Sequence, residues 1–289
     1  MATDASVRSR HQAVADPSYN EGLQSSLKCF GLRCMAFLKR TSKGFNSDLR
    51  SLAGLVAEMG GCAERQLAEA IEALTRRDNE RARANVAADA AIDVMQQTIE
   101  QRAMDIILTR RPVAEDLRQV VGIVRIANEL ERIGDLAKNI SKRIIAINDQ
   151  DIPVRSLRGF THMATLMMTL LRDVLDSFAR RDVAKALDVW MRDFDIDRLC
   201  ASLFRDFLAL MTENPLAITL SVHLLFCVKN IERMGDHATN MAEAIYYMVK
   251  GQALSRERPK ADVVSGLSLA TGEPGEDWLA SAAALPSTG

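Results

Sequence analysis

The chain contains two copies of one unit, and this internal repeat constrains the fold more than any other feature. Residues 76–78 (RRD) recur as residues 180–182, an offset of 104 positions (76 to 180). Residues 131–135 (ERIGD) recur as residues 232–236 (ERMGD), an offset of 101 positions (131 to 232). A nearly constant offset is typical of a duplicated structural unit. The chain is therefore predicted to fold as two similar domains.

Each copy is predicted to consist of three long helices. From Phe45 onward, apolar residues recur at spacings of three and four, as in Leu52, Val56 and Met59. This spacing is typical of one face of an α-helix. Aromatic residues make up only 5% of the chain, which favours helix over strand. We expect helices at residues 45–76, 79–109, 113–148, 154–180, 182–212 and 216–250.

Residues at the breaks between these segments support the predicted helix ends. Asp78 and Asp182 are placed to cap the second and fifth helices. Pro112 and Pro215 lie where the third and sixth helices are expected to begin, a position at which a missing N–H has little cost. Residues 149–153 read as a linker that divides the chain near its middle.

The predicted fold is all-α, with six long helices in two tandem, pseudo-symmetric three-helix bundles. Helices of this length extend about 45 Å and, with short turns, pack as antiparallel bundles. The tail turns to Ser, Gly, Pro and Ala, a composition that does not support a core. The expected division is a disordered N-terminal extension (1–44), a first bundle (45–150), a second bundle (151–252) and a disordered C-terminal tail (253–289).

Composition and motifs exclude several classes of protein. A net charge of −1 gives no basic field for nucleic acid. The five cysteines are odd in number and scattered, which argues against a disulfide framework and favours a reducing compartment. No apolar stretch is long enough to predict a transmembrane segment. No phosphate-binding loop, nucleophile elbow or zinc-protease motif is present, so no catalytic residue is expected.

Paired carboxylates are the most suggestive chemical feature. In each copy the second helix carries D-x-x-x-D and the third carries E-x-x-x-D. Four-residue spacing places both carboxylates on one helix face, with Cβ atoms about 5–6 Å apart. A hard cation held between facing helices would offset their repulsion. The candidate metal ligands are Asp89, Asp93, Glu131 and Asp135 in the first copy and Asp193, Asp197, Glu232 and Asp236 in the second. Candidates for contacts around them are Arg132, Asn139, Arg233 and Asn240.

The same pattern has a simpler reading. Carboxylates and arginines on a charged helix can form surface ion pairs, which contribute little to the stability of the fold. The duplication raises the case for a ligand site, and both readings stay open from the residues alone. Gly134 and Gly235 stand inside both copies of the motif, although glycine weakens a helix. They indicate that a neighbouring helix approaches closely at these positions. Close approach by a ligand is the less favoured interpretation. His237 is expected to point away from Asp236 and not to be a ligand.

At this point the motifs resemble those of a known family. Residues 128–140 (NELERIGDLAKNI) and 230–243 (NIERMGDHATNMAE) are similar to the paired signatures of PhoU proteins. The D-x-x-x-D pairs, and residues 111–112 (RP) followed by 116–118 (DLR), add to the resemblance, which runs from about residue 45 to 251. One departure is that residues 218–220 (ITL) stand where the second copy would repeat DLR.

The resemblance implies a role in phosphate homeostasis. PhoU proteins are cytoplasmic, all-helical negative regulators of phosphate uptake and of the phosphate-starvation (Pho) response. They act with the ATPase subunit of the phosphate ABC transporter and with the sensor histidine kinase of the phosphate two-component system. The resemblance also implies metal at the eight carboxylates, with iron or zinc favoured and magnesium or manganese accepted. We further expect a homodimer, no nucleic acid partner, and membrane association only through partners.

Two other functions compete with the adaptor. The first is a metal-dependent enzyme of the carboxylate-bridged helical-bundle type. Against it, the motifs lack the histidine that commonly accompanies the glutamates in such sites. The second is a plain helical scaffold that binds no metal and whose carboxylates are solvated.

Overall fold

The protein is described by a computed structural model that covers residues 17–147, 150 and 152–255, with side chains described from Gly44 onward. In this part of the chain the secondary structure is helical throughout. The α-helices are α2 (Pro17–Arg76), α3 (Asn79–Arg110), α4 (Glu115–Ile147), α5 (Val154–Arg180), α6 (Val183–Glu213) and α7 (Ile218–Lys250), with a short 3₁₀-helix, η1 (Pro215–Ala217), before α7.

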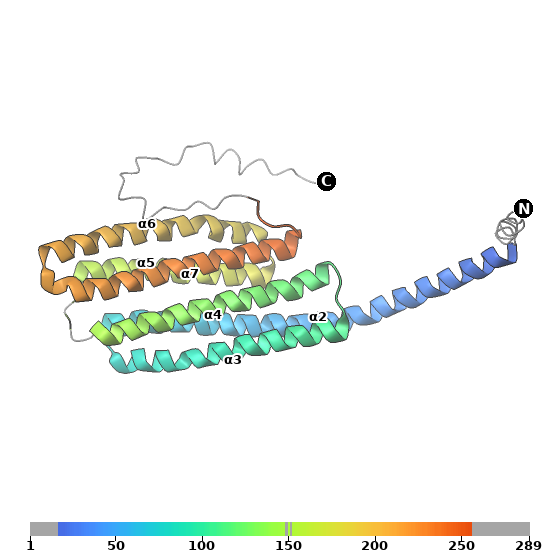
Figure 1. Ribbon diagram of the computed structural model, residues 1–289, viewed down its shortest axis with the longest axis horizontal. Coiled ribbons are helices and arrows are strands. Elements are labelled where there is room, and N and C mark those ends of the chain that lie inside the picture. The colour runs from blue at the N-terminus through green and yellow to red at the C-terminus, as the bar shows by residue number, and fades with distance from the viewer. Residues whose placement is uncertain (1–16, 148–149, 151, 256–289) are drawn as a thin grey trace, which may run out of the picture.

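The helices form the two predicted bundles. Helices α2, α3 and α4 make the first bundle, and α5, α6 and α7 make the second. Figure 1 shows α3 and α6 at opposite outer sides of the molecule, with the other four helices between them. The predicted all-α fold with its six long helices is therefore confirmed.

Local chemistry explains where the helices begin. The carboxylates of Asp78 and Asp182 accept hydrogen bonds from the backbone N–H groups of Arg81 and Lys185, at 3.0 and 3.1 Å, and so cap α3 and α6 as predicted. Pro215 begins η1 and not the α-helix itself, because the Asn214 side chain accepts from the Leu216 N–H and holds a tighter turn. Helix α4 starts at Glu115, two residues later than predicted (113 to 115).

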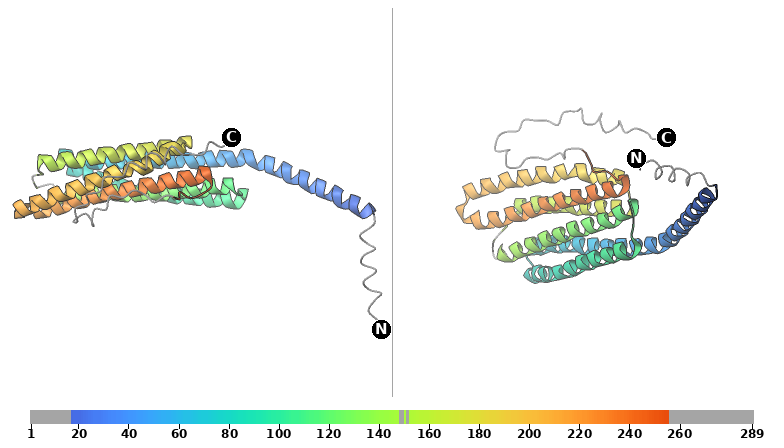
Figure 2. Two further views of the ribbon diagram at one scale, coloured as in Figure 1. Left: turned by 90° about the horizontal axis from the view of Figure 1, so that it is seen from above. Right: turned by 45° about the vertical axis from the view of Figure 1, so that its right-hand side comes forward.

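The first helix begins earlier than predicted. Helix α2 starts at Pro17, so helix replaces the disorder expected for residues 17–44 of the N-terminal extension. Figures 1 and 2 show this N-terminal part running away from the bundles. The prediction placed the helix start at Phe45 because regular apolar spacing begins there, and the Phe45 side chain is 3% exposed. The predicted tails at residues 1–16 and 256–289 lie outside the described residues.

Helix α7 is a core helix with an apolar composition. By length and composition alone, residues Pro215–Lys250 could cross a membrane, but a buried helix of a globular protein passes the same test. Helix α7 packs against α4, α5 and α6, and its fully buried residues include Ile231 and Met234. The most apolar window of the helix is 33% buried, so the core of the bundle accounts for part of its apolar composition.

The two bundles meet through like helices that run antiparallel. The third helix of each copy, α4 and α7, pairs along its whole length. From one end to the other, the contacts join Gln119 to Met248, Arg125 to Tyr247, Glu129 to His237, and Arg143 to Phe226. The first helices pair in the same way, with Glu64 of α2 bonded to Arg172 of α5. Pairing of like with like gives the protein an approximate two-fold relation between its halves.

Two glycines allow this close approach. A Cβ atom added at Gly60 of α2 would lie 2.5 Å from Cδ2 of Leu175 on α5, and one at Gly122 of α4 would lie 2.1 Å from Cγ of Met248 on α7. Both distances are shorter than real non-bonded contacts of a Cβ atom, so a side chain at either position would force Leu175 or Met248 to move.

We expect Gly60→Ala to lower the free energy of unfolding by about 1 kcal/mol or more, because the new methyl group overpacks the α2–α5 contact. Gly54→Ala on the same helix is the matched control, since its Cβ meets nothing within 4 Å. The control should raise the free energy of unfolding by about 0.5–1 kcal/mol through helix propensity. Urea unfolding measures both, and equal stabilisation by the two substitutions would contradict the interface.

Candidate functional site

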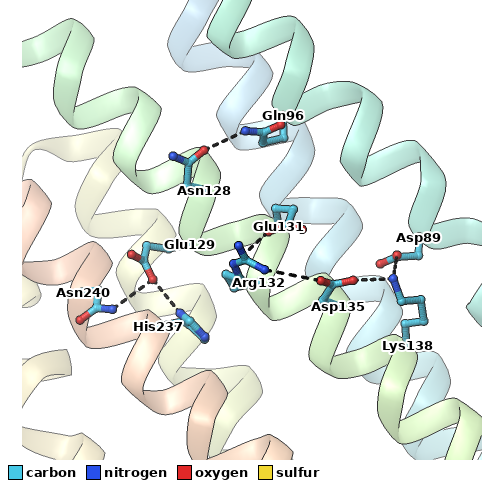
Figure 3. A network of polar contacts seen from close by, with 10 residues as sticks. All are labelled: Asp89, Gln96, Asn128, Glu129, Glu131, Arg132, Asp135, Lys138, His237 and Asn240. Carbon is cyan, nitrogen blue, oxygen red and sulfur yellow. Dashed lines mark hydrogen bonds and ion pairs between the residues drawn. The ribbon is translucent and has the colours of Figure 1, made fainter.

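The first acidic cluster lies between α3 and α4. Asp89 and Asp93 are one turn apart on α3, and Glu131 and Asp135 are one turn apart on α4. Asp89 is buried, whereas the other three are partly exposed. The four-residue spacing in each helix therefore brings the predicted first set of carboxylates onto facing sides of the two helices, as Figure 3 shows for Asp89, Glu131 and Asp135.

Three of these carboxylates line a polar cleft of about 530 Å³. The cleft opens between α3 and α4. Its lining residues are Asp93, Gln96, Gln97, Glu100, Asn128, Glu131, Arg132 and Asp135. Asp89 is not among them, because it is buried beneath the cleft beside Gly134. The carboxylates and amide oxygens in this lining are ligands that suit a hard cation, and Arg132 is its one positively charged residue.

The electrostatics of the cleft favour an added positive charge. Burial raises the pKa of Glu131, Arg132 opposes this rise, and the neighbouring carboxylates of Asp135 and Asp93 add to it. Arg132 lies 3.3 Å from Glu131 and 3.9 Å from Asp135, but its own side chain is largely exposed. The arginine at the rim therefore compensates the carboxylates only in part.

Lys138 is the member of this cluster that the sequence analysis missed. Its ammonium group donates to both Asp89 and Asp135 and joins α4 to α3 beneath the cleft (Figure 3). Burial alone would lower the pKa of Lys138, but the hydrogen bonds to the two carboxylates outweigh it and raise the pKa. The available signal was the three-residue spacing from Asp135, which places both side chains on one face of α4.

The second acidic cluster lies between α6 and α7. Asp193 and Asp197 of α6 are buried, and Glu232 and Asp236 of α7 are partly exposed. Lys229, which the sequence analysis also missed, lies 2.9 Å from Glu232. Burial would lower the pKa of Lys229, but the bond to Glu232 and the nearby Asp197 raise it. The second cluster therefore also contains an ammonium group.

The signature glycines make room for the buried aspartates. A Cβ atom at Gly235 would lie 2.1 Å from Oδ1 of Asp193. One at Gly134 would lie 3.0 Å from Cδ1 of Ile92 and 3.4 Å from Oδ1 of Asp89. The predicted close approach of a neighbouring helix at both glycines is confirmed, and in both bundles the buried aspartate of D-x-x-x-D is among the groups that approach.

The residues expected around the clusters take different positions. Arg132 lines the cleft, as expected. Asn240 instead donates to Glu129 across the bundle interface at 3.1 Å, where His237 also contacts Glu129 at 2.7 Å (Figure 3). Arg233 and Asn139 are exposed. The expectation that His237 is not a metal ligand stays a prediction.

The side chains as they stand do not converge on a metal. Among residues 44–147, 150 and 152–255, no group of three or more His, Cys, Asp or Glu side chains is arranged to hold an ion. The oxygen donors, the cleft and the raised pKa of Glu131 fit a hard cation in chemical type. The lysines hold part of each carboxylate set, so the predicted metal sites stay a prediction.

Comparisons with known proteins match both bundles. A family model described as the PhoU domain matches residues 56–144 and 160–245. The chain is 44% identical over 227 residues to "Phosphate-specific transport system accessory protein PhoU homolog" of Rhizobium meliloti (strain 1021), covering 78% of this chain and 96% of that relative. A protein with the same name from Caulobacter vibrioides (strain NA1000 / CB15N) is 41% identical over 227 residues, covering 78% of this chain and 99% of that relative.

A solved structure shares the fold. The crystal structure of PhoU from Pseudomonas aeruginosa superimposes with a TM-score of 0.70 at 32% sequence identity. The match covers 72% of this chain and all of that structure.

We expect Gly235→Ala to destabilise the protein by about 2 kcal/mol, because its methyl group would collide with a buried carboxylate that has no space to move. Gly134→Ala is the paired control and should lower the free energy of unfolding by less, because the nearest neighbour of the added Cβ atom is the flexible end of Ile92. Urea unfolding of both variants checks the ranking. A larger loss in Gly134→Ala would show that the glycines do not serve the buried aspartates.

Proposed function

This chain belongs to the PhoU family, and from that premise we propose that it is a negative regulator of phosphate uptake and of the phosphate-starvation response. The observation that carries the proposal is the match across both bundles to accessory proteins of phosphate-specific transport. The match covers nearly the whole length of those relatives, so the proposal does not depend on one shared motif.

In this proposal the protein acts in the cytoplasm as an adaptor. It binds the ATPase subunit of the phosphate ABC transporter and the sensor histidine kinase, and it transmits phosphate sufficiency between them. Support comes from the architecture: the two bundles pack back to back and leave the outer sides of α3 and α6 available (Figure 1). Two related surfaces on opposite sides of one rigid core suit a protein that binds two partners.

The buried thiols support a role without catalysis. Burial raises the pKa of the Cys200 thiol to about 11 and that of the Cys227 thiol to about 12, with smaller effects of neighbouring charges. Both thiols are therefore protonated at neutral pH, and a protonated buried thiol is a poor nucleophile. The adaptor is proposed to work by binding alone.

The proposal includes a cation in the cleft of the first bundle. Asp93, Glu131 and Asp135 line this cleft and would supply the oxygen ligands. A bound cation would offset the negative charge of the carboxylates in the cleft and would connect α3 to α4. Iron or zinc is the first expectation from the family resemblance, and magnesium or manganese also accept carboxylate oxygen.

Deletion of the gene should leave the starvation response switched on in phosphate-rich medium, because the restraint on transporter and kinase is lost. A reporter under a starvation promoter measures this, with complementation by the intact gene as the control. Normal repression in the deletion strain would contradict the proposed regulation.

Purified protein prepared without chelator should bind a divalent or trivalent metal, and Glu131→Gln should weaken that binding about tenfold or more. Isothermal titration with each metal salt measures the affinity. Glu58→Gln is the matched control, because Glu58 is exposed on α2 and belongs to neither cluster. Equal metal affinity in both variants would remove the cation from the proposed function while leaving the regulatory role untouched.

A further inference from the structure

We propose that Lys138 and Lys229 are built-in counter-ions of the two acidic clusters, each standing where a metal would otherwise be needed to hold the carboxylates together. This inference rests on the proposed function in one respect, namely that the clusters attract cations. It adds that each bundle already carries one such cation within its own chain.

The first bundle shows the arrangement most clearly. The Lys138 ammonium bridges Asp89 on α3 and Asp135 on α4, so one positive charge serves one carboxylate from each helix (Figure 3). The Asp89 side chain is only 4% exposed, and its Oδ1 atom has no hydrogen-bond partner in the part of the chain that the structure describes. Lys138 therefore compensates this buried charge. In its absence, a bridging metal ion would have to do so.

In the second bundle the lysine lies on the other side of the E-x-x-x-D motif. Lys229 lies three residues before Glu232, whereas Lys138 lies three residues after Asp135. Lys229 bonds to Glu232 at 2.9 Å, on the helix that carries the E-x-x-x-D motif of the second cluster. Here too one ammonium group pairs with a carboxylate of the cluster.

The two lysines do not occupy equivalent positions in the repeat. The counterpart of Lys138 is Thr239, whose hydroxyl donates to the backbone carbonyl of Asp236 at 2.7 Å. The counterpart of Lys229 is Asn128, whose side chain accepts from Gln96 at 2.9 Å. A lysine inherited with the duplication would stand at the same position in both copies. Each cluster therefore contains one lysine, and the two lysines come from different positions of the repeat.

The physical reason is the cost of an unpaired buried charge. A buried carboxylate that loses its only charged partner is strongly destabilising, whereas a second cation restores the balance. The lysines should therefore make the fold independent of metal. Removing either lysine should make its bundle dependent on metal, because the vacated carboxylates are oxygen ligands for a hard cation.

The experiment uses the unaltered full chain and single variants of it. Lys138→Thr and Lys229→Asn each install the residue that stands at the equivalent position of the other copy. Lys142→Thr is the matched control, because Lys142 is exposed on the same helix as Lys138. Thermal unfolding is followed in EDTA and then with Mn²⁺ as the added probe, and the number of Mn²⁺ ions bound per chain is measured by isothermal titration.

In EDTA, we expect Tm to fall by about 5 °C or more in Lys138→Thr and in Lys229→Asn, and not in Lys142→Thr. Added Mn²⁺ should restore Tm in the two cluster variants, and each should bind one more ion than the unaltered chain. Lys138→Arg should keep Tm close to that of the unaltered chain, because the charge is retained.

Two results would overturn the inference. The first is an unchanged Tm in EDTA for Lys138→Met, which keeps an apolar stem and removes the charge. The second is a lowered Tm that Mn²⁺ does not restore, since the lysine would then act by packing. Neither result depends on whether the unaltered chain binds metal or regulates phosphate uptake, so failure here is distinguishable from failure of the proposed function.

Discussion

The antiparallel packing of α4 on α7 is the contact on which the rest of the structure depends. Each of these helices carries one copy of the signature motif, and each packs in two directions. One face contacts the signature helix of the other bundle, where Glu129 contacts His237 and Asn240. The other face contacts the second helix of its own bundle and forms an acidic cluster. Any change in the α4–α7 contact would therefore shift both clusters at once.

The acidic clusters are held by a balance between close approach and charge. Gly134 and Gly235 remove the side chains that would otherwise block Asp89 and Asp193, so the aspartates are buried against the signature helices. Burial of a carboxylate is costly unless a positive charge is near. In the first cluster Lys138 supplies this charge from within the chain, and part of the carboxylate set remains open to the cleft beside it. Asp89 is thereby held by Lys138, Asp93 and Glu131 remain open to the cleft, and Asp135 belongs to both.

Most of the architecture could be predicted because helix periodicity and capping are local properties. The duplicated RRD, D-x-x-x-D and E-R-x-G-D segments identified two units, and Asp78 and Asp182 cap the helices they were expected to cap. The start of α2 at Pro17 was not predicted, because the apolar periodicity on which the prediction rested begins only at Phe45. Lys138, Lys229 and the true position of Asn240 were also missed. Spacing of three residues along one helix could have indicated the pairs Lys138–Asp135 and Lys229–Glu232. The contacts of Lys138 with Asp89 and of Asn240 with Glu129 depend on the rotation of one helix against another, which spacing along a single helix does not determine.

The central claim is that the paired signature helices make the two bundles one cooperative unit that can couple its two outer surfaces. Native-state hydrogen exchange followed by mass spectrometry tests this claim most directly. The account predicts that amides in α4 and α7 are the most protected and that both helices exchange with the same free energy of opening. Loss of protection in one bundle while the other stays protected would contradict it, because the bundles would then open as independent domains.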